Sequence, residues 1–299
     1  MAKYLDKIVF MSKKNRKNPL KSQGSVEKKY KVPFVVRPFE GLKFEADFVA
    51  MRELVPAGTI TAQTNDKYGK RDVTFVSLLP NFAQAVVNSK GKIMVALQTQ
   101  INSGDPSHDL GLILEKALNA DNETVITGVD VRQPAPRLQE MLNNEYECVA
   151  QVHEDCSFWF DEKIDDENIA KAIENSRENI IPTKEIAGVK SAYWCKFNKE
   201  FIRWVLTDDE REVYNALARL KVEGLCDLGE GSKFAGAFRG LGLIVPVWEV
   251  AEGMSFEDTE KAMQKLASNM QKQLANLEPL TDEQKRARAG LVSRQVSLR

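Results

Sequence analysis

The sequence predicts an α+β protein made of two related α+β modules that follow a disordered basic arm. Two matching stretches support this prediction: RELVPAGTI at 52–60 and RENIIPTKEI at 177–186 each end a helix pattern near a proline. A helix, a proline, two strands, a helix, a strand and a helix recur in this order in both halves, which indicates an internal duplication. The alternative is that an α+β protein repeats such an order by chance.

The first module is predicted to span residues 33–127. Its first helix is indicated by Phe48, Met51 and Leu54, which recur at helical spacing until Pro56 ends the pattern. Alternating or continuous apolar runs predict strands, and Pro80 is expected to open a helix. In chain order we expect a strand at 32–42, the helix at 45–55, a strand at 72–79, a helix at 81–89, a strand at 92–101 and a helix within 104–120 capped by Asp105 or Ser107.

The second module is predicted to span residues 151–273. Residues 128–150 are expected to connect the two modules, because Pro134 and Pro136 prevent one continuous helix there. The glycine-rich stretch at 226–240 would be an insertion relative to the first module. In chain order we expect a helix ending near Pro182, a hairpin of 193–197 and 201–206 around Asn198, a helix within 207–224 capped by Thr207 or Asp208, a strand at 242–250 and a helix at 255–270.

The amino-terminal residues 1–32 are predicted to form the disordered basic arm, because residues 11–32 lack hydrophobic periodicity and are rich in Lys, Asn, Ser and Gly. Residues 1–31 contain ten Lys/Arg and two acidic residues, so they carry +8, while the whole chain carries −1 and the remainder −9. A flexible cationic segment attracts phosphate polymers by counterion release. The residues predicted to contact nucleic acid are Lys13, Lys14, Arg16, Lys17, Lys21, Lys28 and Lys29.

The carboxy-terminal residues 274–299 form a second, shorter basic segment. Five cations stand there beside Asp282 and Glu283. Nucleic-acid contact and simple solubilisation explain this composition equally well. The cations are Lys285, Arg286, Arg288, Arg294 and Arg299.

The apolar runs and the cysteines limit the class of protein. With 43% hydrophobic and 28% charged residues the chain can bury a sizeable core, but its apolar runs, such as LIVPVW at 243–248, are too short to span a membrane. No secretory signal is evident, so we expect a cytoplasmic protein. The four cysteines form no CxxC and only two histidines accompany them, so reduced, buried thiols are expected and no metal or cofactor is assigned.

A ligand site is suggested by the stretch LGEGSKFAGAFRGLG at 228–242. Glycines let backbone amides approach a phosphate, and a nearby cation would complete the site. GxxxxGK[ST] is absent, however, and a glycine-kinked hairpin explains the same residues. Arg52 and Arg177 could line a cleft between the halves, or could be ordinary helix charges. The residues considered for ligand binding are Arg52, Arg177, Gly229, Gly231, Lys233 and Arg239.

No catalytic residue is assigned. His153 and Cys156 are three residues apart, and in a strand such positions point to opposite faces. No GxSxG or other nucleophile motif is present. The four tryptophans are expected in the core, with stacking on bases as the alternative.

Seven stretches together resemble one protein family. They are RPFEGL at 37–42, RELVPA at 52–57, GDPSHDL at 104–110, PRLQEML at 136–142, AYWC at 192–195, LGEGSKFAGAFRGLGLIVPVW at 228–248 and RARAGLVSRQVSLR at 286–299. The chain resembles an uncharacterised actinobacterial family of cytoplasmic proteins of roughly 300 residues. Some members are named after the preprotein translocase ATPase or a topoisomerase, but this chain has neither a nucleotide-binding loop nor a CxCxS-type tail. The resemblance therefore transfers no mechanism.

Three hypotheses of function follow. The preferred one is a non-enzymatic protein that contacts RNA, ribosome or DNA through its basic arm. The first alternative is a small-ligand-binding or enzymatic module with an anionic-ligand site between the two halves, lined by Arg52, Arg177, Lys233 and Arg239. The second is an interaction scaffold at the secretion machinery, which only the names of family members suggest.

Overall fold

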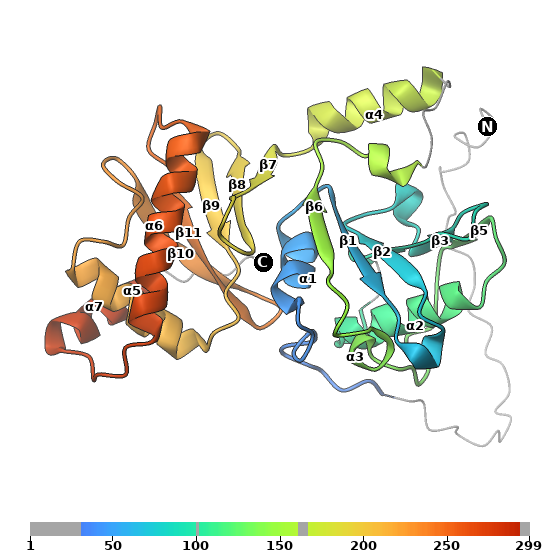
Figure 1. Cartoon of the computed structure of the whole chain (residues 1–299), viewed down its shortest axis with the longest axis horizontal. Coiled ribbons are helices and arrows are strands. Elements are labelled where there is room, and N and C mark those ends of the chain that lie inside the picture. The colour runs from blue at the N-terminus through green and yellow to red at the C-terminus, as the bar shows by residue number, and fades with distance from the viewer. Residues whose placement is uncertain (1–30, 100–101, 161–166, 294–299) are drawn as a thin grey trace, which may run out of the picture. The chain divides into compact units, whose positions relative to one another are not determined.

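The computed structural model of the chain describes residues 31–99, 102–160 and 167–293. These residues form seven α-helices and two β-sheets, so the predicted α+β class is confirmed (Figure 1). The seven arm residues predicted to contact nucleic acid lie outside the described ranges. Within those ranges, no helix has the length and apolar character needed to cross a membrane.

The first sheet has six strands in the order β5-β3-β4-β2-β1-β6. Only β2 and β4 pair in parallel, and the other neighbours are antiparallel. The parallel pair arises because β3 turns back to lie on the far side of β4. The strands are β1 (Gly58–Gln63), β2 (Asp72–Val76), β3 (Ala85–Val87), β4 (Ile93–Ala96), β5 (Thr124–Ile126) and β6 (Val149–Val152).

Alternation along the strands gives the first sheet two unequal faces. Ile93 and Val95 of β4 join the large hydrophobic core with α1 (Glu45–Glu53) and α2 (Pro106–Leu118). Met94 and Ala96 face the other way and join a small cluster that includes side chains of a 3₁₀ turn at Ser157–Trp159. The helices therefore cover one face of this sheet.

The amino terminus of α2 is positioned by three sequence features. Asp105 caps it by accepting the Ser107 N–H at 3.1 Å, and Pro106 occupies the first turn. Residue 111, inside the helix, is a glycine because a Cβ at this position would collide with the carbonyl oxygen of Pro136. This close approach brings α3 (Leu138–Met141) against α2.

The second sheet has five antiparallel strands in the order β10-β11-β9-β8-β7. A second hydrophobic core joins it to α5 (Glu210–Val222), α6 (Phe256–Leu274) and α7 (Asp282–Val292). In the sequence, α4 (Glu167–Asn179) lies between the last strand of the first sheet and the first strand of the second sheet. The strands are β7 (Thr183–Glu185), β8 (Ala192–Lys196), β9 (Glu200–Trp204), β10 (Lys233–Gly240) and β11 (Leu243–Glu249).

Helix α1 is shared by the two sheets. The core that contains its Phe48, Val49 and Met51 also contains side chains from the second sheet and the segment after β9, namely Tyr193, Val205, Phe238, Leu243 and Val245. Polar contacts add to this packing, since Arg203 of β9 donates to Leu54 O at 3.0 Å. The second sheet is thus covered by α1 on one face and by α5, α6 and α7 on the other.

The predicted helix at 81–89 is wrong. Pro80 opens only a 3₁₀ turn, Pro80–Phe82, and β3 follows. Ala85 and Val87 are buried on one side of the strand and pair with Val95 and Ile93, so the tertiary environment favours a strand over the helix pattern. The run at 32–42 also lacks strand structure.

The internal duplication is not shown by this fold. The second half has α5 at the place where the first half has β3, and its sheet contains no parallel pair. The segment 128–150 contains α3 and the start of β6, which pairs with β1. The first sheet therefore extends beyond residue 127. The common feature that remains is a helix that ends shortly before a proline, at Pro56 and at Pro182.

Candidate functional site

Arg52, predicted to bind a ligand, instead ties α1 to the end of β4. Its guanidinium donates to Leu97 O, and Gln98 Nε2 donates to Arg52 O at 3.1 Å. Its Nε lies 3.5 Å from Glu53 Oε1. Burial lowers the pKa of Arg52, and the carboxylate of Glu53 opposes this effect. These contacts are those of a structural arginine.

The other three predicted ligand-binding cations are each held by a carboxylate. Arg177 lies on α4, whereas Lys233 and Arg239 lie near opposite ends of β10 and bind carboxylates of two different elements, β11 and α5. The pairs are Arg177 with Asp155 at 2.6 Å, Lys233 with Glu249 at 3.2 Å and Arg239 with Glu210 at 2.6 Å.

The glycine-rich stretch forms a turn and the hairpin β10–β11. Gly229 and Gly231 have φ values of +125° and +80°, which glycine adopts readily. Ser232 closes the turn by donating its N–H and its hydroxyl to Gly229 O. Gly231 lines a pocket of about 690 Å³ that also includes Lys199 and Glu249. Lys199 binds Glu249 and Lys196 binds Glu200, so both lysines that line this pocket are already paired with carboxylates.

A different pocket, which we call the junction pocket, lies where α1 meets the second sheet. Its volume is about 430 Å³. Its walls come from the start of α1 and the residues just before it, the turn at 188–191, the end of β9 with the segment that follows it (204–208), and α6. A ligand site between the halves was expected from the sequence, but none of the residues predicted to line it lies in this pocket.

Two carboxylates of α1, buried Glu45 and half-buried Asp47, hold the segments around the junction pocket. Glu45 accepts from Arg37 through both oxygens, at 2.6 and 2.7 Å, and Arg37 Nη2 also donates to Thr207 O at 3.2 Å. Asp47 accepts the Ser191 hydroxyl at 2.8 Å. Burial raises the pKa of Asp47, while Ser191 and Lys190 oppose the rise.

Ser191 takes an uncommon backbone conformation to make its contact. Its φ is +57°, in the left-handed region that non-glycine residues seldom adopt. The side chain is buried, so its hydroxyl is committed to Asp47. No spacing motif marks this residue, which explains why sequence reasoning missed it.

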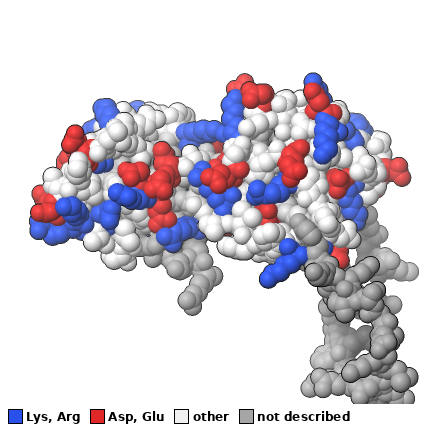
Figure 2. Space-filling model, turned by 90° about the horizontal axis from the view of Figure 1, so that it is seen from below, with Lys and Arg blue, Asp and Glu red and all other residues white. Residues whose placement is uncertain are grey.

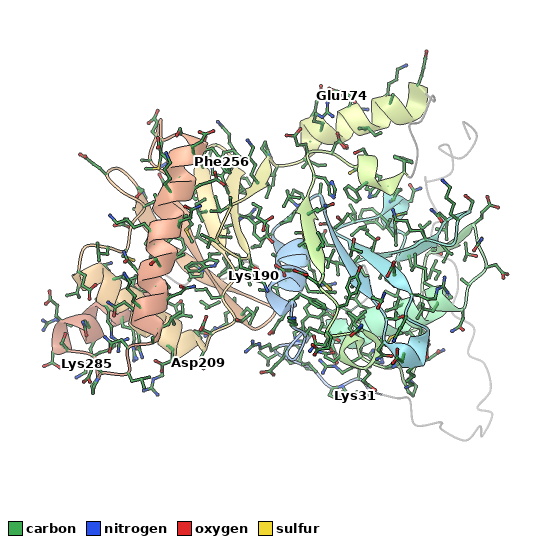
Figure 3. All side chains as sticks on the ribbon, viewed as in Figure 1. Lys31, Glu174, Lys190, Asp209, Phe256 and Lys285 are labelled. Atoms are coloured by element: carbon green, nitrogen blue, oxygen red, sulfur yellow. The ribbon has the colours of Figure 1, made fainter. Side chains whose placement is uncertain are left out.

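Two lysines from opposite sides of the junction line this pocket. Lys190 Nζ lies 3.9 Å from Asp47 Oδ2, and Figure 3 labels Lys190 beside α1. Within the described ranges, Lys43 has no carboxylate within ion-pair distance, and exposed Asp208 also lines the pocket. The pocket thus presents two ammonium groups beside an apolar wall that includes Trp204.

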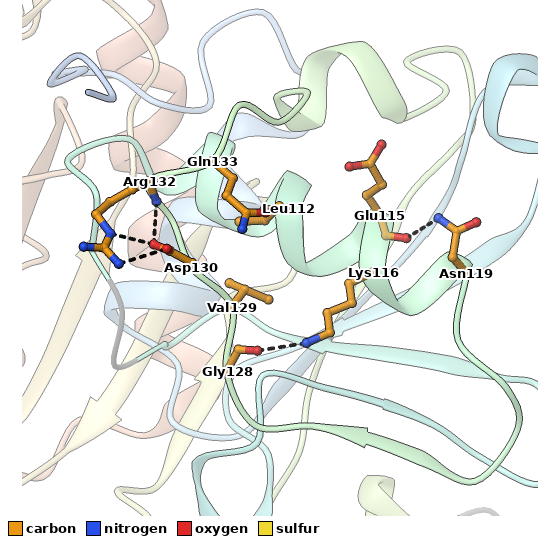
Figure 4. Close-up of a pocket in the computed structure, with 9 residues that line it drawn as sticks. All are labelled: Leu112, Glu115, Lys116, Asn119, Gly128, Val129, Asp130, Arg132 and Gln133. Atoms are coloured by element: carbon orange, nitrogen blue, oxygen red, sulfur yellow. Dashed lines mark hydrogen bonds and ion pairs between the residues drawn. The ribbon is translucent and has the colours of Figure 1, made fainter. Parts of the chain in front are cut away.

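A second depression, the α2 groove, runs between α2 and the loop at 128–133, with a volume of about 690 Å³ (Figure 4). Lys116 Nζ donates to Gly128 O at 3.0 Å across it. Arg132 binds both oxygens of Asp130, at 2.7 and 2.9 Å. Its cations are therefore already engaged, and these contacts hold the loop beside the helix.

Two of the family motifs meet in a buried polar network at the start of α2. Arg137 of PRLQEML binds both oxygens of buried Asp105 of GDPSHDL, at 2.8 and 3.3 Å, and donates to Pro38 O. Ser107 accepts the Leu138 N–H at 3.0 Å. These hydrogen bonds join the start of α2, the segment before α3 and the stretch around Pro38. We therefore assign these residues a structural role.

The histidines and cysteines give no sign of a metal centre or nucleophile. In the described part of the chain, no group of three His, Cys, Asp or Glu is placed to hold a metal ion. His153 Nε2 lies 3.0 Å from Thr59 Oγ1, and burial lowers the pKa of His153. The cysteines are free, and burial raises the pKa of Cys148 and Cys226 to about 12.

Comparison with known proteins places the chain in a family but supplies no activity. No curated protein and no solved structure matches it. A family model described as a family of unknown function, DUF5926, matches residues 38–299, and the chain belongs to that family, as its motifs indicated.

Proposed function

We propose that the chain is a cytoplasmic, non-enzymatic protein that binds nucleic acid, as free RNA, ribosome or DNA, through its basic segment 1–31. The observation that carries this proposal is the separation of charge, +8 in residues 1–31 against −9 in the remainder. Such a segment gains affinity for a phosphate polymer by releasing condensed counterions. The acidic remainder supplies no comparable attraction.

The surface of the described residues supports the assignment of nucleic-acid binding to segment 1–31 and not to the rest of the chain. Cationic and anionic side chains are interspersed on the face shown in Figure 2. The body cations first considered for ligand binding are engaged by Glu53, Asp155, Glu249 and Glu210. A mixed surface of this kind produces little long-range attraction for a polyanion.

The test is co-purification of nucleic acid with the full-length chain. Its matched variant carries Lys13→Gln, Lys14→Gln, Arg16→Gln and Lys17→Gln, and a control variant carries four exposed lysines changed to Gln, namely Lys221, Lys261, Lys265 and Lys272. Each protein is purified from lysate at about 50 and about 300 mM salt, with and without nuclease. We expect nuclease-sensitive nucleic acid with the native and control proteins at low salt and a large loss with the arm variant. Equal recovery with all three proteins would overturn the proposal.

A second candidate function is binding of a small anion in the junction pocket. The observation that favours it is the pair Lys43 and Lys190, which reach one pocket from opposite sides. A ligand that binds only the folded state raises the melting temperature. Phosphate, pyrophosphate and citrate should therefore stabilise the native chain and fail to stabilise the double variant Lys43→Gln, Lys190→Gln. Equal shifts for the two proteins would exclude this site.

A further inference from the structure

A further pocket, which we call the α5 pocket, lies between the start of α5 and the carboxy-terminal half of α7. The two helices pack side by side (Figure 1), and Asp209, labelled in Figure 3, marks the end of α5 that the pocket adjoins. Its volume is about 340 Å³. The residues that line it are Asp209, Glu210, Arg211, Tyr214, Arg288 and Val292.

One residue that lines the α5 pocket has a buried hydroxyl without a hydrogen-bond partner. Tyr214 has 2% of its surface exposed, and within the described ranges its hydroxyl oxygen has no donor or acceptor at hydrogen-bond distance. A buried polar group that lacks a partner costs free energy, and native proteins pair nearly all such groups. The Tyr214 hydroxyl is therefore available to a ligand that accepts a hydrogen bond.

Helix geometry directs the Tyr214 side chain toward the pocket. Side chains on a helix point toward its amino terminus and lie over the residues three and four positions earlier. For Tyr214 these residues are Arg211 and Glu210, which both line the pocket. Burial raises the pKa of Tyr214, the Glu210 carboxylate adds to the rise, and the Arg239 guanidinium opposes it. The hydroxyl thus lies near Glu210, at the wall of the pocket.

Two arginines bring positive charge to the same pocket. Arg288 of α7 is half-buried and donates to Asn215 Oδ1 at 3.0 Å. In the part of the chain that the structure describes, no carboxylate lies within ion-pair distance of Arg288. A guanidinium has five N–H donors, so Arg288 keeps donors for a ligand. The Arg211 side chain is 77% exposed, and its Nε lies 3.8 Å from Glu212 Oε1.

The two carboxylates that line the pocket are already engaged. Asp209 caps α5 by accepting the Arg211 N–H at 2.9 Å. Glu210 accepts two hydrogen bonds from Arg239, at 2.6 and 2.7 Å, so its charge is neutralised. Arg211 and Arg288 therefore outweigh Asp209 by one positive charge, and the pocket favours an anion.

We propose that the α5 pocket binds a small oxyanion, a phosphate or a carboxylate, between the Tyr214 hydroxyl and the guanidinium groups of Arg211 and Arg288. A hydrogen bond from a neutral donor to an anionic oxygen is stronger than one between neutral groups. The planar guanidinium matches the oxygen spacing of both phosphate and carboxylate. None of the lining residues belongs to the junction pocket or to segment 1–31, so this site is separate from both.

The test is isothermal titration calorimetry of the full-length chain with inorganic phosphate and with malonate, at constant ionic strength. The two probes distinguish a phosphate site from a carboxylate site. We expect the native chain to bind at least one of them, and Tyr214→Phe to bind it about 10- to 150-fold more weakly, the range for one lost hydrogen bond to a charged group. Native affinity in Tyr214→Phe, or no binding of either probe by the native chain, would overturn the proposal.

The stability of Tyr214→Phe separates lost binding from lost structure. The substitution removes only the hydroxyl, which has no partner in the free protein. Tyr214→Phe should therefore unfold in urea at the native midpoint or above it. A clearly lower midpoint would show that the hydroxyl is already satisfied within the fold and would overturn its role in ligand binding.

Three further variants locate the anion. Arg288→Gln removes a cation of the pocket and should weaken binding, whereas Tyr68→Phe removes a hydroxyl near the first sheet and should bind as the native chain does. The double variant Lys43→Gln, Lys190→Gln changes only the junction pocket and should keep the α5 site. Binding that is lost in the double variant and kept in Tyr214→Phe would place the anion in the junction pocket and contradict the α5 site.

Discussion

Asp105 is the residue on which the buried polar network depends most. It caps α2 through the Ser107 N–H and binds Arg137 through both oxygens. Asp105→Ala should lower the free energy of unfolding by about 2–4 kcal/mol, from a lost helix cap and a lost charge-assisted hydrogen bond. Asp105→Asn keeps an oxygen for the cap and should cost less. Urea titration measures both values, and an Ala variant as stable as the native chain would contradict the assigned role.

Cys148 should be an unreactive thiol in the folded protein. Burial, with a smaller effect from the Asp47 carboxylate, raises its pKa from 9.0 to about 12. Because the thiolate is the nucleophile, its population near pH 8 should fall by about a thousandfold relative to the unfolded chain. Iodoacetamide labelling of the Cys148 peptide, followed by mass spectrometry in buffer and in urea, measures this ratio. Folded and unfolded rates within tenfold of each other would be inconsistent with such burial.

At the scale of elements, two helical glycines should respond to alanine in opposite directions. In α2, a Cβ on residue 111 would meet Pro136 O, whereas in α7 a Cβ on Gly290 would meet nothing within 4 Å. Gly111→Ala should therefore destabilise the protein although alanine favours helices. Gly290→Ala should stabilise it by up to about 1 kcal/mol. Thermal unfolding measures both, and a stabilising Gly111→Ala would show that α2 and residue 136 are not in contact.

The helices of this fold were more predictable than its strands. The apolar spacing around Met51 and the cap at Asp105 indicated α1 and α2 at nearly their observed bounds. The segment after Pro80 was wrongly predicted as a helix because its apolar residues have helical spacing. In the structure Ala85 and Val87 pair with β4 instead. Local spacing of apolar residues does not reveal which strands pair with one another. For the same reason the sequence could not reveal that β6 joins the first sheet.

The candidate site was less predictable than the fold. The cations predicted to bind a ligand were chosen by motif. Arg177, Lys233 and Arg239 are instead paired with carboxylates from other parts of the chain. The junction pocket is lined instead by Lys43 and Lys190, which carry no motif. The property that a sequence does reveal is the charge of segment 1–31, because a sum of charges needs no coordinates.

At the scale of the whole molecule, the core shared through α1 should make the two sheets unfold together. Phe48 is fully buried against Phe39, Phe44 and Phe75, in a core that also includes Tyr193 of the second sheet. Phe48→Ala should cost about 3–5 kcal/mol.

The tryptophans make this coupling measurable. Trp194, Trp204 and Trp248 lie in the second sheet, whereas Trp159 packs against the first sheet. In a Trp159→Phe background the tryptophan fluorescence therefore reports unfolding of the second sheet, and circular dichroism reports both sheets. Phe48→Ala should lower the urea midpoint equally by both probes. A fluorescence midpoint that stays at its native value would show that the sheets unfold independently.

If residues 1–31 bind nucleic acid, as we propose, the affinity should depend on salt through the phosphates that these residues contact. Affinity of the full-length chain for a single-stranded RNA is measured over a range of salt concentrations, beside the variant with Lys13, Lys14, Arg16 and Lys17 changed to Gln. We expect the slope of log K against log salt to be shallower by about 3 in the variant, since four phosphate contacts are lost. Identical slopes for the two proteins would contradict the claim.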